Sequence, residues 1–520
     1  MIDIKAILEK GEKLTVEAKL AKGGLPKSLW ETYSSFANSF GGTILLGVEE
    51  DKSTKELTVV GLDDTNKMIS DFWNIVNNRN KVNANILFDD NVYEMDYEGK
   101  KIIVIEVPRA DRHDKPIYIN GDRFTGSFRR NKDGDYHCSE EEVLTMLRDK
   151  AESSADNTVL EKCPMEYLNE DSIKSYRTAF GNLRDGHVWT KLGNDEFLTK
   201  IGAARKDEKG ILHPTVAGLI FFGDFTYITD FLPNFFLDYR EQKGGKNRWT
   251  DRVCSGDGDW SGNVFDFYFK IVHKLTADVE KPFQLDSNSL RIDQTEVHDA
   301  LREVLANALI HADYYGRRGI VIEKDFKTIK FSNPGTFRVN IDEAIDGGIS
   351  DARNSKIFNM FALINVGERS GMGLCDLYSI WEQNGFEVPQ IEETLNPDRV
   401  SITLKLEGNN SPSVGNDGNN VGNNVGNGGN RVGNNGKNVG NDDEDVLEIE
   451  DMDAFLEGFL TKTEFIIFEI IKENPKISAA KIAKDINISK RSVERSIAVL
   501  KEKGFIAREG STRGKWIILK

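Results

Sequence analysis

The sequence predicts a multidomain chain of the mixed α/β (α+β) class that ends in a separate, basic unit. Short apolar, β-branched runs alternate with segments of helical periodicity as far as residue 407. Residues 408–441 then contain 13 Asn and 10 Gly in 34 positions, a composition with too little apolar surface to form a core. Beyond them, residues 460–520 hold 14 Lys and Arg against 7 Asp and Glu, although the whole chain carries a net charge of −17. At roughly 150 residues per domain, the 520 residues suggest three or four domains.

The charge is unevenly divided along the chain. Residues 460–520 carry +7, so the remaining 459 residues carry −24. A uniformly acidic chain would argue against a nucleic-acid partner, but a basic terminal unit removes that argument.

The sequence also indicates where the protein resides. No apolar run approaches the roughly 18 residues that span a bilayer, and the N-terminus lacks the basic and apolar regions of a signal peptide. The cysteines are Cys138, Cys163, Cys254 and Cys375, which are far apart and form no C-x-x-C pair. We therefore expect a cytoplasmic protein with reduced thiols and no membrane partner.

Residues 1–150 are predicted to form a first domain of alternating helices and strands. The runs 43–48 and 101–107 have the length and the β-branched content of strands. Residues 140–148 are predicted to form a closing helix, because Ser139 and Glu142 have the spacing of a capping box.

Residues 151–290 are predicted to form a connecting α+β region. Its clearest signals are two apolar runs, 219–222 and 231–237, which we expect to be buried strands.

Residues 408–459 are predicted to form a disordered linker. Val-Gly-Asn units recur within 408–441, so a tight β-solenoid is the less favoured alternative. Residues 442–457 follow with nine acids and no base.

Residues 460–520 are predicted to contain three helices and a β-hairpin. Pro475 ends the first helix, Ser478 caps the second, and Ser489 caps a third with the apolar stripe Val493, Ile497 and Leu500. Two strands, 505–508 and 515–519, complete a winged helix-turn-helix arrangement.

A basic third helix is typical of a helix that enters the major groove of DNA. The predicted DNA-binding residues are Ser489, Lys490, Arg491, Arg495, Arg508, Arg513 and Lys515. The alternative is a winged helix used for protein contact, and the positive charge of this helix favours DNA.

A set of polar residues in 291–407 suggests a nucleotide site. Glu303 and Asn307 are four residues apart in a predicted helix over 297–311 and therefore share a face. Strands at 319–323 and 328–332 lead to Asn333-Pro-Gly335, and Arg353 and Asn354 follow. Gly371 and Gly373 then open an apolar helix, where backbone N–H groups can approach phosphate oxygens.

This order of motifs resembles the divergent ATP-binding domains of the GHKL class, relatives of gyrase and histidine kinases, over residues 291–407. The resemblance implies that Asn307 ligates Mg²⁺ on bound ATP and that Glu303 orients or deprotonates the attacking water. It implies that Asn333 and Gly335 line the adenine pocket, that Gly371 and Gly373 form the phosphate lid, and that Arg353 and Asn354 belong to the cofactor site. The GHKL pattern Asp-x-Gly-x-Gly is replaced here by Asn333-Pro-Gly335, whose amide can accept from an adenine amino group without charge.

No G-x-x-x-x-G-K-[ST] motif occurs, so the motif evidence excludes a P-loop ATPase or helicase. We expect at most slow ATP hydrolysis. His311, next to the nucleotide helix, is expected to be structural.

The N-terminal segment contains a second set of functional candidates. Glu12, Glu17 and Lys19 are followed by Phe36-Ala-Asn38 and a Gly-Gly turn that leads to Glu50. This resembles the Schlafen AlbA-like pattern over residues 10–150. In Schlafen ribonucleases the corresponding acids form a metal-dependent centre that cuts transfer RNA. The resemblance implies Mg²⁺ or Mn²⁺ on Glu12, Glu17 and Glu50, with Lys19 as a phosphate contact.

Two alternatives remain open for this domain. Glu17 and Lys19 lie on one face of a strand and could form a structural ion pair, leaving a domain that only binds nucleic acid or protein. A candidate nucleic-acid surface comprises Arg109, Arg112, Lys115, Arg123, Arg129, Arg130 and Lys132. Acids interspersed among these residues make an ordinary solvated face equally compatible.

The leading hypothesis is an ATP-binding, nucleic-acid-binding transcriptional regulator whose DNA binding is controlled by nucleotide, with self-association as in GHKL relatives. The alternative is an ATP-gated, metal-dependent endoribonuclease in phage or stress defence, acting on transfer RNA or other RNA at the N-terminal domain. A third possibility is a scaffold that nucleotide only stabilises.

Overall fold

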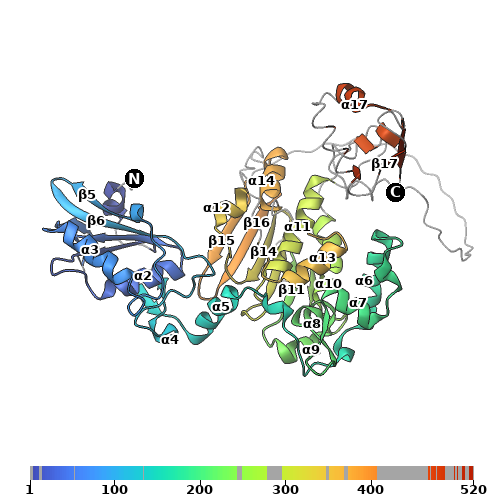
Figure 1. The fold of residues 1–520 in the computed structure, drawn as a ribbon, viewed down its shortest axis with the longest axis horizontal. Helices are drawn as coiled ribbons and strands as arrows, with labels where there is room; N and C mark the ends of the chain where they lie inside the picture. Colours follow the sequence, from blue (N-terminus) through green and yellow to red (C-terminus); the bar gives the residue numbers. More distant parts are fainter. Residues whose placement is uncertain are drawn as a thin grey trace, which may run out of the picture. The chain divides into compact units, whose positions relative to one another are not determined.

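The structure is a computed structural model, and its chain divides into two compact units, Met1–Gly415 and Asn416–Lys520 (Figure 1). The described residues of the first unit are 4–10, 14–51, 53–132, 134–242, 249–277, 295–346, 351–367 and 373–406. Those of the second are 467–468, 470–472, 474–475, 477–485, 493, 497, 500–501, 506–509 and 515–518. The predicted linker, 408–459, lies outside them.

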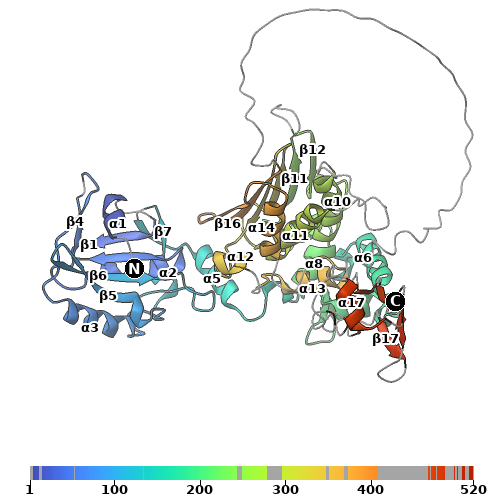
Figure 2. The ribbon, with the colours of Figure 1, turned by 90° about the horizontal axis from the view of Figure 1, so that it is seen from above.

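A four-stranded sheet organises the N-terminal domain. Its strand order is β1 (Val16–Lys19), β2 (Gly42–Leu46), β6 (Lys100–Val107) and β5 (Val92–Tyr97), with β1 and β2 parallel and the other pairs antiparallel. Helices α2 (Ser28–Asn38) and α3 (Thr65–Val76) contribute to the same core as one face of this sheet (Figure 2). The predicted strands at 43–48 and 101–107 are confirmed in type.

Both faces of this sheet are buried, which explains why its central strands are continuously apolar. Ile44 and Ile105 pack under α2 and α3, whereas Leu45 and Val104 belong to a second cluster on the other face. The smaller elements of the domain are α1 (Ile4–Lys10), β3 (Val48–Glu50), β4 (Leu57–Val59), η1 (Asp89–Asn91), α4 (Arg123–Gly126), β7 (Phe128–Asn131) and β8 (Gly134–His137).

Helix α5 (Glu140–Lys150) follows the N-terminal domain, as predicted. Its N-terminus has the expected capping box, in which the Ser139 hydroxyl accepts from the Glu142 N–H and the Glu142 carboxylate accepts from the Ser139 N–H. These contacts satisfy N–H groups that have no partner within the helix.

A six-stranded mixed sheet organises the rest of the first unit. Its order is β12 (Asp251–Cys254), β11 (Leu237–Glu241), β13 (Ile320–Lys324), β14 (Thr328–Pro334), β16 (Arg399–Lys405) and β15 (Gln390–Thr394). Only the β11–β13 pair is parallel. Helices α10 (Val264–Thr276), α11 (Glu296–His311) and α14 (Gly373–Gln383) pack together beside it (Figure 1). The helices predicted at 297–311 and from Gly373 are confirmed.

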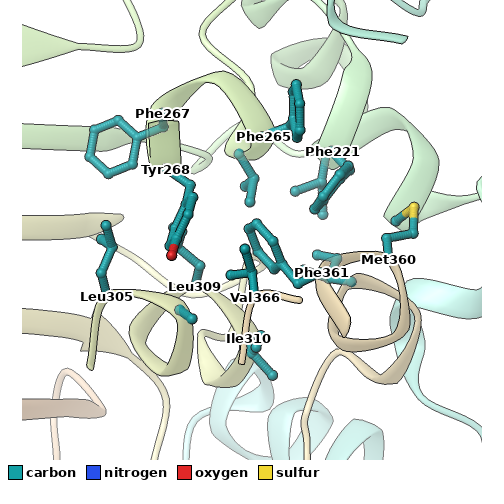
Figure 3. Close-up of a cluster of buried hydrophobic side chains, with 14 of the residues drawn as sticks. Phe221, Phe265, Phe267, Tyr268, Leu305, Leu309, Ile310, Met360, Phe361 and Val366 are labelled. Carbon is teal, nitrogen blue, oxygen red and sulfur yellow. The ribbon is translucent and has the colours of Figure 1, made fainter. Parts of the chain in front are cut away.

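One hydrophobic core extends through this region. It includes Phe221, Tyr268, Leu309 and Phe361, from four helices distant in sequence (Figure 3). Because β11 and β12 precede residue 291, the sheet crosses the predicted boundary between 151–290 and 291–407. The other elements are η2 (Ala155–Asn157), η3 (Met165–Tyr167), α6 (Glu170–Leu183), η4 (Val188–Lys191), α7 (Asn194–Ile201), β9 (Ala204–Lys206), β10 (Leu212–Pro214), α8 (Val216–Phe222), α9 (Phe225–Phe231), α12 (Ile341–Asp346) and α13 (Ser355–Leu363).

The two strands predicted in 151–290 are wrong. Residues 219–222 lie in helix α8, whose first turn is capped by the Thr215 hydroxyl accepting from the Gly218 N–H. Residues 231–237 join α9 to β11, which begins only at Leu237. All seven residues of α8 are buried, so the helix is apolar on every side and shows no helical periodicity.

The second unit contains helix α17 (Ala479–Asp485) and the antiparallel pair β17 (Ile506–Glu509) and β18 (Lys515–Ile518). Ser478 caps α17 as predicted, since its hydroxyl accepts from the Lys481 N–H at 3.3 Å. The predicted stripe of Val493, Ile497 and Leu500 is buried in the core of this unit. None of the described helices in either unit is long and apolar enough to cross a membrane.

The close packing of α8 predicts that a Gly→Ala substitution lowers stability at Gly218 in α8 but raises it at Gly181 in α6. A Cβ at Gly218 would lie 1.8 Å from the Ala203 carbonyl oxygen, whereas a Cβ at Gly181 in α6 would meet nothing within 4 Å. Gly218→Ala is therefore expected to lower the free energy of unfolding by about 3 kcal/mol through overpacking. Gly181→Ala is expected to raise it by about 0.5 kcal/mol. Urea unfolding of both variants measures the difference, and equal effects would contradict this packing.

Candidate functional site

The strongest candidate site is built on the polar face of helix α11. Asn307 Nδ2 donates a hydrogen bond to Glu303 Oε1 at 3.0 Å, which confirms that the two side chains share a face. The opposite face of α11 is buried in the core through residues such as Leu305 and Leu309. The apolar face thus anchors the helix, and the pair is held at a fixed place above the sheet.

The N-terminus of α14 lies against this pair. A Cβ at Gly373, the first residue of α14, would lie 3.0 Å from both Glu303 Oε1 and Asn307 Nδ2. A larger side chain would therefore displace the pair, and glycine permits the close approach. The structure brings three of the sequence-predicted residues together here. Gly371 lies outside the described residues.

A pocket of about 120 Å³ opens beside these residues. Its lining residues are Glu303, Asn307, Ala308, His311, Phe331, Asn333, Thr336, Phe337, Arg338, Val339, Ala344, Asp351, Gly373, Leu374, Val400 and Ile402. Asn333 is buried, with no hydrogen bond between its side chain and another described residue, and it is surrounded by the apolar sheet residues Phe331, Val400 and Ile402. The pocket therefore has a carboxylate–amide end and an apolar wall with one free amide.

His311 also lines this pocket, although the sequence suggested a structural role. Burial, followed by the charges of Arg353 and Arg338, lowers the pKa of His311 to about 4. The imidazole is therefore neutral at pH 7, with one N–H donor and one acceptor. Its position four residues after Asn307 is the sequence signal that could have identified it.

Arg353 and Asn354 support the pocket instead of lining it. Arg353 Nε donates to the His311 carbonyl at 3.1 Å, and Asn354 Nδ2 donates to the Ile310 and Ala312 carbonyls at 2.9 and 2.7 Å. Both side chains thus bind the last turn of α11. Gly335, at φ +107°, packs on the Arg353 guanidinium and does not line the pocket either.

Of the three N-terminal acids predicted to hold a metal, the structure describes Glu17 and Glu50. Glu17 Oε1 accepts from Lys19 Nζ at 2.9 Å, and Glu17 Oε2 accepts from Arg130 Nη2 at 2.8 Å. The Arg130 side chain is only 1% exposed and also pairs with Asp135 at 3.0 Å. Glu17 and Lys19 thus form the ion pair that one of the two alternatives expects, and this pair belongs to a larger charged network.

Glu50 pairs instead with Lys55, at 3.2 Å. Within the described part of the chain, no group of three His, Cys, Asp or Glu side chains could hold a metal ion. Glu12 lies outside that part, so the three-carboxylate site stays a prediction. The DNA-binding candidates Ser489, Lys490, Arg491, Arg495 and Arg513 and the side chain of Arg508 also lie outside it, whereas Lys515 is described and exposed.

The predicted basic surface of the N-terminal domain is wrong in its main part. Arg109 binds Glu393 through two hydrogen bonds of 2.5 and 2.8 Å, and Arg129 binds Asp398 through two of 2.7 and 3.1 Å. Arg112 pairs with Asp351. These residues form an internal interface with the six-stranded-sheet region, which we call the arginine interface. Arg123 and Lys132 are exposed.

The environment of Glu17 predicts a loss of stability when its charge is removed. Glu17→Gln leaves the buried Arg130 guanidinium with one carboxylate partner fewer, which is expected to lower the free energy of unfolding by about 2 kcal/mol. Glu49→Gln is the matched control, since Glu49 is exposed on the neighbouring strand β3. Thermal melting of both variants measures the effect, and equal melting temperatures would contradict a structural role for Glu17.

Three family models match the chain. Residues 12–139 match the Schlafen AlbA_2 family, residues 144–238 a domain of unknown function (DUF8451), and residues 460–507 the winged helix-turn-helix DNA-binding family. These matches leave residues 239–459 uncovered, so the GHKL resemblance stays a prediction.

The solved structures that are similar to the chain include the following two. The DIP2311 protein from Corynebacterium diphtheriae is 15% identical over 99% of this chain and 83% of its own, with a TM-score of 0.37. The N-terminal domain of a RecG-related protein from Nitrosomonas europaea is 29% identical over 26% of this chain and 88% of its own, with a TM-score of 0.21. No curated protein matches the sequence. By its family matches, the chain carries a Schlafen AlbA_2 domain at residues 12–139 and a winged helix-turn-helix DNA-binding domain at residues 460–507.

Proposed function

We propose that the protein is a regulator that binds DNA through its winged helix and binds Mg²⁺-ATP in the pocket beside α11. The observation that carries the proposal is the meeting of Glu303, Asn307 and Gly373 at the N-terminus of α14. Each of these residues supplies something that a magnesium nucleotide requires.

Asn307 is suited to a hard cation. Its Nδ2 is used by the hydrogen bond to Glu303, so its carbonyl oxygen is the atom left for a ligand. Mg²⁺ prefers oxygen ligands and commonly combines one or two protein oxygens with phosphate oxygens and water. One amide oxygen beside a carboxylate fits this requirement when the nucleotide supplies the remaining ligands.

The N-terminus of α14 is suited to the phosphates. The first backbone N–H groups of a helix have no partner within it, and the helix dipole favours negative charge at that end. Since Gly373 has no side chain, nothing of its own covers these N–H groups.

The apolar wall is suited to the base. Phe331, Val400 and Ile402 offer a surface for a flat ring, and the free amide of Asn333 and the neutral imidazole of His311 can bond its edge. The same pocket supports Glu303 as the group that orients water for slow hydrolysis.

We propose no catalytic role for Glu17 in the N-terminal domain, because both of its carboxylate oxygens accept hydrogen bonds from cationic side chains.

The first prediction is that Asn307→Ala weakens binding of Mg²⁺-ATP at least tenfold, about 1.4 kcal/mol, while binding of metal-free ATP changes less. Isothermal titration calorimetry with and without Mg²⁺ measures both. Asn182→Ala, at an exposed position of α6, is the matched control. Undiminished Mg²⁺-ATP binding in Asn307→Ala would refute the assignment of this pocket.

The second prediction concerns DNA. In the full chain, replacing Lys490, Arg491 and Arg495 with Ala is expected to weaken duplex binding and to reduce the slope of log K against log salt by up to about 2.7, because phosphate contacts are lost. The matched control replaces the exposed Lys200, Lys206 and Lys209, which removes the same charge. Fluorescence anisotropy over a salt series measures the slopes.

Nucleotide control of DNA binding is tested in the same assay. Mg²⁺-ATP should change the duplex affinity of the wild type and not that of Asn307→Ala, and equal responses of the two proteins would refute nucleotide control.

A further inference from the structure

A second and larger cavity, of about 340 Å³, lies at the arginine interface. The N-terminal domain contributes Arg109, Arg112, Lys115 and Arg129, α5 contributes Asp149, and the segment after β14 contributes Arg338. This volume is almost three times that of the pocket beside α11. Its walls are mostly charged side chains, in contrast with the apolar wall of the pocket beside α11.

The cationic side chains that line this cavity outnumber the carboxylates that are paired with them. Arg109 is paired with Glu393, and Arg129 with both Asp398 and Glu142, while Asp351 is the one paired carboxylate for both Arg112 and Arg338 among the described residues. Asp149 is already paired with Arg353. Of the other lining acids, Asp111 and Glu343 are exposed to solvent, where water screens their charge.

Lys115 is the cation of this wall with no carboxylate partner among the described residues. Its nearest hydrogen-bond acceptor is the Asn38 carbonyl, at a long 3.4 Å. The Asn38 side chain also holds the backbone at Ile117, because Nδ2 donates to the Ile117 carbonyl at 2.7 Å and Oδ1 accepts from its N–H at 2.8 Å. The backbone that carries Lys115 is therefore anchored beside the cavity.

The protonated form of Lys115 is costly in this environment. Burial, and then the charges of Arg109 and Arg129, lower its pKa from 10.5 to about 7, and Glu393 and Asp398 only partly oppose them. Cys138 and Glu142 also lie near Arg129. Burial raises the pKa of the Cys138 thiol to about 12, so the thiol is neutral and supplies no compensating charge. The Glu142 carboxylate is paired with Arg129 and not with Lys115. A bound anion would supply that charge.

We propose that this cavity binds a small phosphorylated molecule whose phosphoryl group lies on Lys115 between Arg109 and Arg129. A phosphate monoester is mostly a dianion at pH 7, since its second pKa is near 6. Its three terminal oxygens are strong acceptors, so it can accept from Lys115 and from the two neighbouring guanidinium groups, whereas a carboxylate has only two oxygens. The Arg129 Nε–H, buried with no hydrogen-bond partner in the described part of the chain, is a further unmet donor at the same wall.

The test is calorimetric titration of the full chain with orthophosphate, pyrophosphate and AMP. At least one of these is expected to bind the wild type and to bind Lys115→Met at least tenfold more weakly. Lys67→Met, at an exposed position of α3, is the matched control. An unchanged affinity in Lys115→Met, no binding of any probe at millimolar concentration, or equally tight binding of malonate would overturn the proposal.

The pH dependence gives a second readout. Between pH 7 and 9 the phosphate monoester of AMP stays dianionic while Lys115 loses its proton, so the wild-type affinity for AMP is expected to fall about tenfold or more. Lys115→Met should show no such fall. Repeating the AMP titration in Asn307→Ala separates the two sites, because binding here does not use Asn307, and loss of all AMP binding in that variant would place AMP in the other pocket and overturn its assignment to Lys115.

The free protein provides a control for folding. Folding lowers the pKa of Lys115, so its protonated side chain destabilises the folded state most below pH 7. This destabilisation decreases as the pH rises toward 10.5. Lys115→Met is therefore expected to melt at a higher temperature than the wild type at pH 6, with a smaller difference at pH 9. A lower melting temperature at both pH values would show that Lys115 serves packing and would overturn the proposal.

Discussion

The first unit depends on buried and half-buried arginines that pair with carboxylates more than two hundred residues away. Arg109 and Arg129 each bind both oxygens of one acid, Glu393 and Asp398, at and beside the strand pair β15–β16. Planar two-point contacts of this kind define orientation as well as distance. Removing one partner would leave a buried charge without its counter-ion. The ion pairs therefore hold the two regions against each other. Through these contacts the Schlafen AlbA_2 domain shares a cavity with the sheet region.

The candidate nucleotide pocket illustrates how an apolar core places polar chemistry. Helix α11 is buried along most of its length, and that burial leaves few positions at which a polar side chain can be tolerated. Glu303 and Asn307 occupy such positions, bond to each other, and face the start of α14, whose first residue, Gly373, has no side chain. The last turn of α11 is held in addition by Arg353 and Asn354. Packing energy thus holds two polar groups in place before any ligand binds.

Local patterns predicted local structure well. The capping box at Ser139 and Glu142, the shared face of Glu303 and Asn307, and the buried stripe of the third C-terminal helix all depend on residues three or four apart, and the structure confirms them. The strand predicted at 219–222 is part of helix α8, because a short helix buried on every side has no polar face to reveal its period. The nucleic-acid surface predicted at Arg109 and Arg129 is wrong as well, since no local pattern identifies carboxylate partners so distant in the chain.

Residues 336–339 form a wall of both cavities, the pocket beside α11 and the one at the arginine interface. The Phe337 carbonyl accepts from Arg109, its N–H donates to Glu393, and the Thr336 carbonyl accepts from Arg353. A shift of this segment therefore reshapes both cavities together. If filling one changes the affinity of the other, thermodynamic reciprocity requires the two effects to be equal in free energy. These four residues would then couple the occupancy of one cavity to the ligand affinity of the other.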